Sequence, residues 1–195
     1  IVNGTRMMII FTDGSANAIN TDHLAYAGWG LFIRAGSHQN LGGAITGKPI
    51  TSYRAEVRAV LEAIWRTRNP TCIVTDCKTV YQITSDILQQ CEKGHKLTWP
   101  KDDGCHDYWE TIAEMVQARQ PDIAVRWMPS HLDEPEKEKA REMYLATGGC
   151  ERWIQGNCGA DEMAKKGAKL AAPPEHLLSR ERITHTFVRT VQRMA

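Results

Sequence analysis

Alternating apolar and polar segments along the chain predict a group of strands followed by alternating helices and strands. A continuous apolar run at residues 7–11 is typical of a buried strand. Residues 28–34 and 38–46 predict two more strands joined by a tight turn, so the first part of the chain reads as an antiparallel meander. Residues 71–76 and 122–130 predict two further strands.

Helical periodicity fills the segments between and after these strands. Thr51 or Ser52 can cap a helix over residues 53–68, which places four apolar residues on one face: Ala59, Val60, Ala63 and Ile64. Further helices are predicted at residues 79–90, 107–119, 133–143 and 157–171. This order predicts an α/β fold with one mixed sheet of three antiparallel plus two parallel strands, flanked by helices on both faces. The fourth strand is expected to run parallel to the first through a right-handed crossover.

The ends of the chain suggest how it is organised. Pro173-Pro174 marks a boundary, which predicts a domain over residues 1–172 and a tail over residues 173–195. The tail reads as an amphipathic helix with four arginines and two glutamates. The chain starts at Ile1 without an initiator Met, so we expect a fragment of a longer polypeptide. The sequence shows neither a signal peptide nor an apolar run of the length that spans a membrane.

Composition limits the classes of protein without selecting one. The chain has 195 residues, 42% of them hydrophobic and 24% charged, with a net charge of +1, so any nucleic-acid groove would have to be locally basic. Six cysteines without CxxC spacing predict a reduced intracellular protein, in the cytoplasm or nucleus. The alternative is a zinc site, whose ligands would be Cys91, His95, Cys105 and His106, but their spacing is irregular.

Four carboxylates stand where the predicted fold would gather them. Asp13 and Asp76 follow the first and fourth strands, and the carboxyl ends of neighbouring parallel strands meet at one edge. Glu56 lies near the start of the intervening helix, and Asp161 near the start of the last one. Such acids repel one another unless cations lie between them, and oxygen ligands suit Mg²⁺ or Mn²⁺. Two ions about 4 Å apart can hold the attacking water and the leaving oxygen of a phosphodiester.

Each acid also has a simpler interpretation. Asp13 could belong to an Asp-Gly turn, Asp76 could cap the following helix, and Asp161 could be a first-turn acid favoured by the helix dipole. Glu56 could be an ordinary solvated helix residue, and His131 an ordinary loop histidine. The metal site is favoured because these separate explanations would all have to hold at once.

Five segments in order resemble the ribonuclease H family: "FTDGSA", "YRAEVRAVLEAI", "VTDCKTV", "VRWMPSH" and "GNCGADEMAKKGA". The resemblance spans about residues 7–170. It implies a ribonuclease H-like fold and metal-dependent endonucleolytic cleavage of the RNA strand of RNA–DNA hybrids, leaving 3′-hydroxyl and 5′-phosphate ends. It also implies roles for single residues: Asp13, Glu56, Asp76 and Asp161 as catalytic metal ligands, and His131 as a mobile histidine that assists water access or product release.

The resemblance implies substrate contacts as well, with departures from the family pattern. The implied contacts are Gly14, Ser15, either Asn17 or Asn20, Ser52 and Lys78. Ser52 and Tyr53 stand where the family usually has Asn or Gln, and Lys78 where it often has Gln. Ser52 can still bind a 2′-hydroxyl, and Lys78 can reach a phosphate.

The largest departure is the long connection between His131 and Asp161, which are thirty positions apart. The extra segment, Leu132–Gln155, resembles insertions in ribonuclease H domains of retrotransposon polyproteins, which would make the rest of a reverse-transcriptase polyprotein a partner. The segment is expected to supply no metal ligand. It is either a solvated helical excursion or a lid or docking surface, with Tyr144 and Trp153 as apolar anchors.

Two other functions stay open for the same fold. The first is a different nuclease, of the resolvase or integrase type, and the second is a non-catalytic module that binds nucleic acid. The four retained carboxylates favour catalysis, and the isolated domain is expected to be a monomer.

Overall fold

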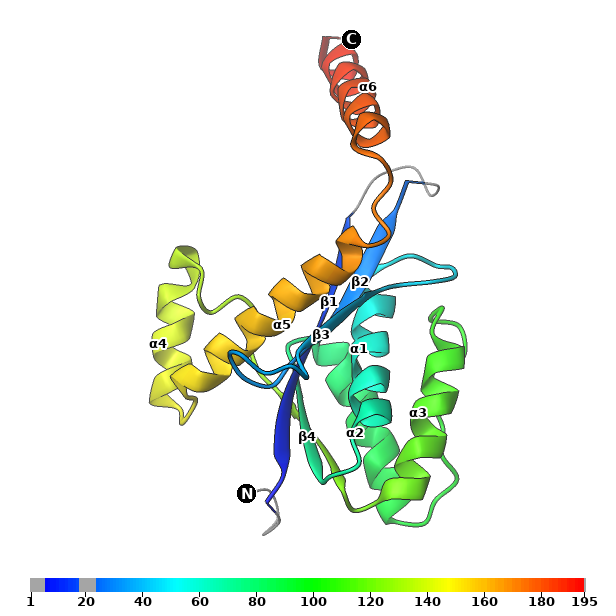
Figure 1. Ribbon diagram of the computed structural model, residues 1–195, viewed down its shortest axis with the longest axis vertical. Coiled ribbons are helices and arrows are strands. Elements are labelled where there is room, and N and C mark those ends of the chain that lie inside the picture. The colour runs from blue at the N-terminus through cyan, green and yellow to red at the C-terminus, as the bar shows by residue number, and fades with distance from the viewer. Residues whose placement is uncertain (1–5, 18–23, 195) are drawn as a thin grey trace.

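The computed structural model describes residues 6–17 and 24–194 of the chain (Figure 1). Within these residues the strands form one five-stranded sheet in the order β3-β2-β1-β4-β5. The strands are β1 (Met8–Asn17), β2 (Tyr26–Phe32), β3 (Leu41–Ala44), β4 (Thr71–Thr75) and β5 (Ile123–Trp127). Antiparallel pairing joins β1, β2 and β3, and parallel pairing joins β1, β4 and β5. The predicted mixed sheet is therefore confirmed.

Helices cover both faces of this sheet (Figure 1). They are α1 (Ser52–Arg66), α2 (Lys78–Glu92), α3 (His106–Arg119), the short 3₁₀ helix η1 (Pro135–Lys137), α4 (Glu138–Ala146), α5 (Glu151–Lys169) and α6 (Glu175–Met194). The first three pack on one face and α5 on the other. Thr51 caps α1, because its side chain accepts a hydrogen bond from the backbone N–H of Arg54 at 3.1 Å.

Strand alternation divides the core into two clusters. Ile10 points toward the face covered by α1 and α3, where Ile64 and Trp109 are fully buried. The next residue, Phe11, points to the opposite face and packs near Val74. Successive side chains of a strand leave opposite faces, so a continuous apolar run at the start of β1 serves both clusters.

The first strand extends well beyond the apolar run that predicts it. Asp13 is not its last residue, because β1 continues to Asn17 through antiparallel pairing with β2. Parallel pairing with β4, in contrast, ends at Thr12 opposite Thr75. Polar residues can continue a strand where a neighbouring strand supplies hydrogen-bond partners, and this explains the difference from the predicted end.

The last core helix begins earlier than its sequence pattern predicts. It starts at Glu151 instead of residue 157, so Asp161 lies in the middle of α5 and not in its first turns. Packing supplies the reason: Ile154 is buried, and the Trp153 ring meets Phe11 edge-on at 6.2 Å. The segment inserted before α5 is therefore shorter than predicted, and it consists mainly of η1 and α4.

The inserted segment is mostly exposed, but two of its aromatic residues contact the core. Helix α4 has no buried residue, in agreement with a solvated excursion. Tyr144 and Trp153, the two suggested docking anchors, pack instead against the second core cluster. Helix α6 extends away from the sheet (Figure 1), and the division at residues 172 and 173 stays a prediction. In the described part of the chain, no helix combines the length and apolar character required to cross a membrane.

Candidate active site

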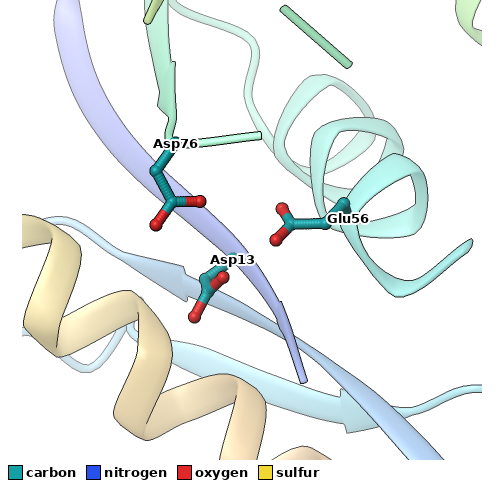
Figure 2. A group of neighbouring side chains, drawn as sticks. All are labelled: Asp13, Glu56 and Asp76. Atoms are coloured by element: carbon teal, nitrogen blue, oxygen red, sulfur yellow. The ribbon is translucent and has the colours of Figure 1, made fainter. Parts of the chain in front are cut away.

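Three carboxylates converge at the end of the parallel part of the sheet (Figure 2). One oxygen from each of Asp13, Glu56 and Asp76 lies within 4.8 Å of the others. Asp13 comes from β1, Glu56 from α1, and Asp76 directly follows β4. Asp13 and Glu56 are buried and Asp76 is half-buried. The structure thus brings together three of the four carboxylates that the sequence singles out.

Strand register places the two aspartates side by side. Thr12 pairs with Thr75 in the last step of the parallel ladder, and each is followed by one of the aspartates. By alternation, Asp13 shares the face of β1 occupied by Phe11, which is the face covered by α5.

The close approach of α1 to β1 places Glu56 beside the two aspartates. A Cβ atom at Gly14 would lie 2.3 Å from the backbone nitrogen of Glu56, so only glycine allows this separation. Gly14, one of the implied substrate contacts, therefore has a packing role that the sequence reasoning does not anticipate.

The electrostatics of the group favour a bound cation. Burial, reinforced by the charge of Asp76, raises the pKa of Asp13 to about 7. Burial and the charge of Asp13 raise the pKa of Glu56 well above its usual range, and burial also raises that of Asp76. Glu56 Oε2 is buried without a hydrogen-bond partner. Clustered, desolvated oxygen ligands with an unpartnered lone pair fit a hard divalent cation such as Mg²⁺ or Mn²⁺.

Two residues that the sequence reasoning misses orient Asp76. The Asn157 side-chain amide donates to Asp76 Oδ2 at 2.9 Å, and Trp127 Nε1 donates to the backbone oxygen of Asp76 at 3.0 Å. Asn157 is buried on α5, and its own Oδ1 has no partner. The available signal was its position four residues, or one helical turn, before Asp161. Partners of this kind fix the orientation of ligand carboxylates.

Asp161 stands apart from the group of three. Its side chain is 25% exposed and accepts a hydrogen bond from Lys165 Nζ at 2.6 Å. Its charge still reaches the group, because it adds to burial and to the charge of Asp76 in raising the pKa of Asp13.

His131 follows β5 and lies near the group, because its charge acts on Asp76. Its side chain is 52% exposed, and Nδ1 lies 3.3 Å from Glu134 Oε1. Its backbone φ of 55° is in the left-handed region, which non-glycine residues seldom adopt. This placement is compatible with an auxiliary role at the mouth of the site.

The implied substrate contacts fall into three groups. Ser52 and Lys78 are exposed at the first positions of α1 and α2. Ser15 is half-buried on β1, and the Asn17 amide donates to the Tyr26 hydroxyl at 2.6 Å. Asn20 lies outside the described residues.

Tyr53, which replaces a usual family amide, points elsewhere. Its hydroxyl donates to Asp103 Oδ2 at 2.7 Å, so it ties α1 to the loop before α3. The expected zinc alternative fails in the same region. His106 Nδ1 accepts a hydrogen bond from Trp99 at 2.9 Å, and Cys105 is buried. Among the described residues, only Asp13, Glu56 and Asp76 form a group able to hold a metal.

Comparisons with known proteins identify the family of this chain. The sequence profile of the RNase H family matches residues 5–169. The chain is 29% identical over 143 residues to a ribonuclease H from Zymomonas mobilis subsp. mobilis, a match that covers 71% of this chain and 86% of the relative.

Solved structures share the fold. The RNase H domain of PFV, solved in solution, has a TM-score of 0.56 at 22% identity and covers 83% of this chain and 94% of its own. The foamy viral protease-reverse transcriptase in complex with RNA/DNA hybrid has a TM-score of 0.53 at 18% identity, covering 86% of this chain and 22% of its own.

Proposed function

The chain belongs to the ribonuclease H family, and from this premise we propose that it hydrolyses the RNA strand of RNA–DNA hybrids. The family makes it an endoribonuclease; the hybrid substrate and the 3′-hydroxyl and 5′-phosphate products belong to the proposal. The observation that carries it is the buried group formed by Asp13, Glu56 and Asp76, whose unpartnered oxygen calls for a cation.

We assign the metal-binding role to this group. Asp13, Glu56 and Asp76 would hold two divalent ions, Mg²⁺ or Mn²⁺, with Asp161 joining as the fourth ligand. When bound, such ions act as Lewis acids toward the scissile phosphate. The protein holds the ligands in place: Gly14 permits the approach of Glu56, and Asn157 orients Asp76. His131, near the group, would assist water access or product release.

The start of α1 and the start of α2 are the proposed hybrid-binding elements. Their exposed first residues, Ser52 and Lys78, flank the carboxylate group in sequence and can reach a 2′-hydroxyl and a phosphate. Backbone N–H groups at a helix start favour phosphate as well. Ser15 and Asn17 on β1 remain candidate contacts, although the Asn17 amide already binds Tyr26.

We also propose that the domain comes from a retroelement polyprotein and works as a monomer when isolated, in the cytoplasm or nucleus. Support comes from the long connection between His131 and Asp161, and from structural neighbours that include a protease-reverse transcriptase chain. A coding sequence that continues into a reverse transcriptase would agree with this origin. A self-contained ribonuclease H gene would contradict it.

Matched RNA–DNA, RNA–RNA and DNA–DNA duplexes, each incubated with Mg²⁺, Mn²⁺ or EDTA, test the proposed activity. We expect cleavage of the hybrid RNA strand with either metal and none with EDTA. Preferential cleavage of DNA duplexes or branched DNA would favour a resolvase-type or integrase-type nuclease. Binding without cleavage of any duplex would favour the non-catalytic module. An Asp76→Asn preparation controls for contaminating nuclease.

A further inference from the structure

One cation of the chain already lies at the proposed metal site. Lys165, one helical turn after Asp161 on α5, donates from Nζ to Asp161 Oδ2 at 2.6 Å. Three of the four proposed ligands form a compact group without any such partner, whereas the fourth is held by an ammonium.

The surroundings of Lys165 are acidic beyond this single contact. Asp161 holds the pKa of Lys165 above its ordinary value, and the charges of Asp13 and Asp133 act in the same direction. The Lys165 ammonium therefore lies in the field of the carboxylate group and of the start of the inserted segment, as well as against its own helix neighbour.

A neighbouring pair on the same helix shows that helical spacing alone does not produce this contact. Lys166 and Glu162 have the same four-residue spacing, but their charged atoms are 3.9 Å apart and both side chains are about two-thirds exposed, at 65% and 69%. Asp161, at 25% exposed, is much less solvated. Exposed pairs of this spacing contribute about 0.3–0.5 kcal/mol and carry no function by themselves.

We propose that Lys165 is a built-in competitor for the second metal ion. Its ammonium neutralises Asp161 when ions are absent and must leave before that carboxylate can coordinate a divalent cation. This inference rests on the proposed function, because it takes Asp161 to be a metal ligand.

Simple electrostatics explain the competition. An ammonium and a divalent cation repel each other, and both would need the same Asp161 carboxylate. The Lys165 side chain is 59% exposed, so its flexible stem can carry the charge out into solvent when an ion binds. The competition therefore weakens the ion that uses Asp161 and leaves the ion held by the buried group of three nearly unchanged.

Calorimetric titration with Mn²⁺ tests the proposal without any nuclease assay. The variants are Lys165→Met, which keeps the apolar stem and removes the charge, and Lys165→Arg, which keeps the charge. Lys166→Met is the matched control one residue further along α5. We expect Lys165→Met to bind the weaker Mn²⁺ ion about two- to fivefold more tightly, as the loss of one charge pair implies. The tighter ion should be unaffected, and Lys165→Arg and Lys166→Met should resemble the wild type.

The outcomes separate this inference from the proposed function. Absence of Mn²⁺ binding in every folded variant would contradict the metal site itself, and the inference with it. Equal or weaker binding of the second ion by Lys165→Met, beside normal binding of the first, would overturn the inference alone. So would an unchanged Mn²⁺ isotherm combined with a raised KM for the hybrid, since Lys165 would then be a phosphate contact. Thermal unfolding of each variant confirms that it is folded.

Discussion

The buried carboxylate group and Asp161 show two ways of placing acids around one site. Asp13, Glu56 and Asp76 are brought together by backbone: a parallel ladder that ends beside both aspartates, and a strand-helix contact that tolerates only glycine. Asp161 lies on α5, which covers the face of the sheet that Asp13 shares, and its side chain is held by a flexible lysine.

Because of this difference, we expect substitutions in the carboxylate group and at Asp161 to have different effects. The backbone holds the group of three together, and the cost appears as raised pKa values and an unpartnered buried oxygen. The charge of Asp161, in contrast, is paired with the Lys165 ammonium. We therefore expect variants in the backbone-held group to be the most damaging.

The largest expected effect separates the two kinds of ligand directly. Asp76→Asn should reduce cleavage by about 10³-fold or more, because it removes a ligand charge from the buried group. The reduction in cleavage by Asp161→Asn should be at least tenfold smaller than that by Asp76→Asn. The reason is that this carboxylate lies outside the group of three and is already paired with the Lys165 ammonium. Steady-state cleavage of a hybrid in Mn²⁺ gives the comparison, and equal losses would erase the distinction between the two regions.

The pH dependence of the free energy of unfolding reports how much the clustered carboxylates destabilise the metal-free protein. Burial raises the pKa of Asp13 from 3.8 to about 7, so the folded state binds its proton more tightly than the unfolded state does. The resulting stabilisation is complete below about pH 4 and is lost as the pH rises through 7. At about 1.4 kcal/mol per pKa unit, metal-free protein should lose about 4 kcal/mol across this window.

Urea unfolding in EDTA between pH 4 and 8 tests this expectation. Asp13→Asn should flatten the profile, and Mn²⁺ should restore stability at pH 8. Stability that rises with pH in the ion-free protein, and does so equally in Asp13→Asn, would show that the carboxylates are not destabilising one another.

Much of this arrangement could be predicted from the sequence, and the exceptions have a common physical reason. Apolar periodicity and strand order are enough to predict the mixed sheet. The positions of Asp13 and Asp76 after parallel strands are enough to predict that these two carboxylates lie together. Asn157, the early start of α5 and the packing role of Gly14 could not be predicted in this way. Each depends on a contact between segments far apart in sequence, such as Asn157 with Asp76 or Trp153 with Phe11.

Asn157 links the two regions, and its removal should have an intermediate effect. Asn157→Ala deletes the hydrogen bond that orients Asp76 from α5, and second-layer partners of this kind typically contribute about 10- to 100-fold in metal affinity or activity. Gln155→Ala, an exposed position on the same helix, is the control. Mn²⁺ calorimetry and hybrid cleavage should both weaken in Asn157→Ala, and normal values for both would reduce Asn157 to a packing residue.

His131 should matter less than any member of the buried group. Its side chain is exposed, so His131→Ala should lower kcat by about tenfold while leaving Mn²⁺ affinity unchanged, because the ions held by the carboxylates would supply most of the transition-state stabilisation. Turnover and calorimetry on the same preparation separate the two effects. A loss as large as that of Asp76→Asn would make its role central.

The smallest effect on catalysis is expected from the inserted segment, provided that the replacement respects where α5 begins. A Gly/Ser linker in place of residues 134–148 removes η1 and α4, including Tyr144, which packs against the second core cluster. It keeps Leu132 and Ile154, which belong to that cluster, and Trp153, which packs against it. It should keep metal-dependent cleavage within about threefold, because α4 buries no residue and its acids lie outside the carboxylate group.

Replacing residues 133–154 instead, which is nearly the whole segment inferred from sequence (Leu132–Gln155), should destabilise the fold by several kcal/mol. The reason is that it removes Trp153 and Ile154 from their contacts with the core. Thermal unfolding and hybrid cleavage of the two replacements side by side test this boundary. If the shorter replacement folds normally yet no longer binds Mn²⁺, one of the removed acids is a metal ligand, and the division between a backbone-held site and a dispensable insertion is wrong.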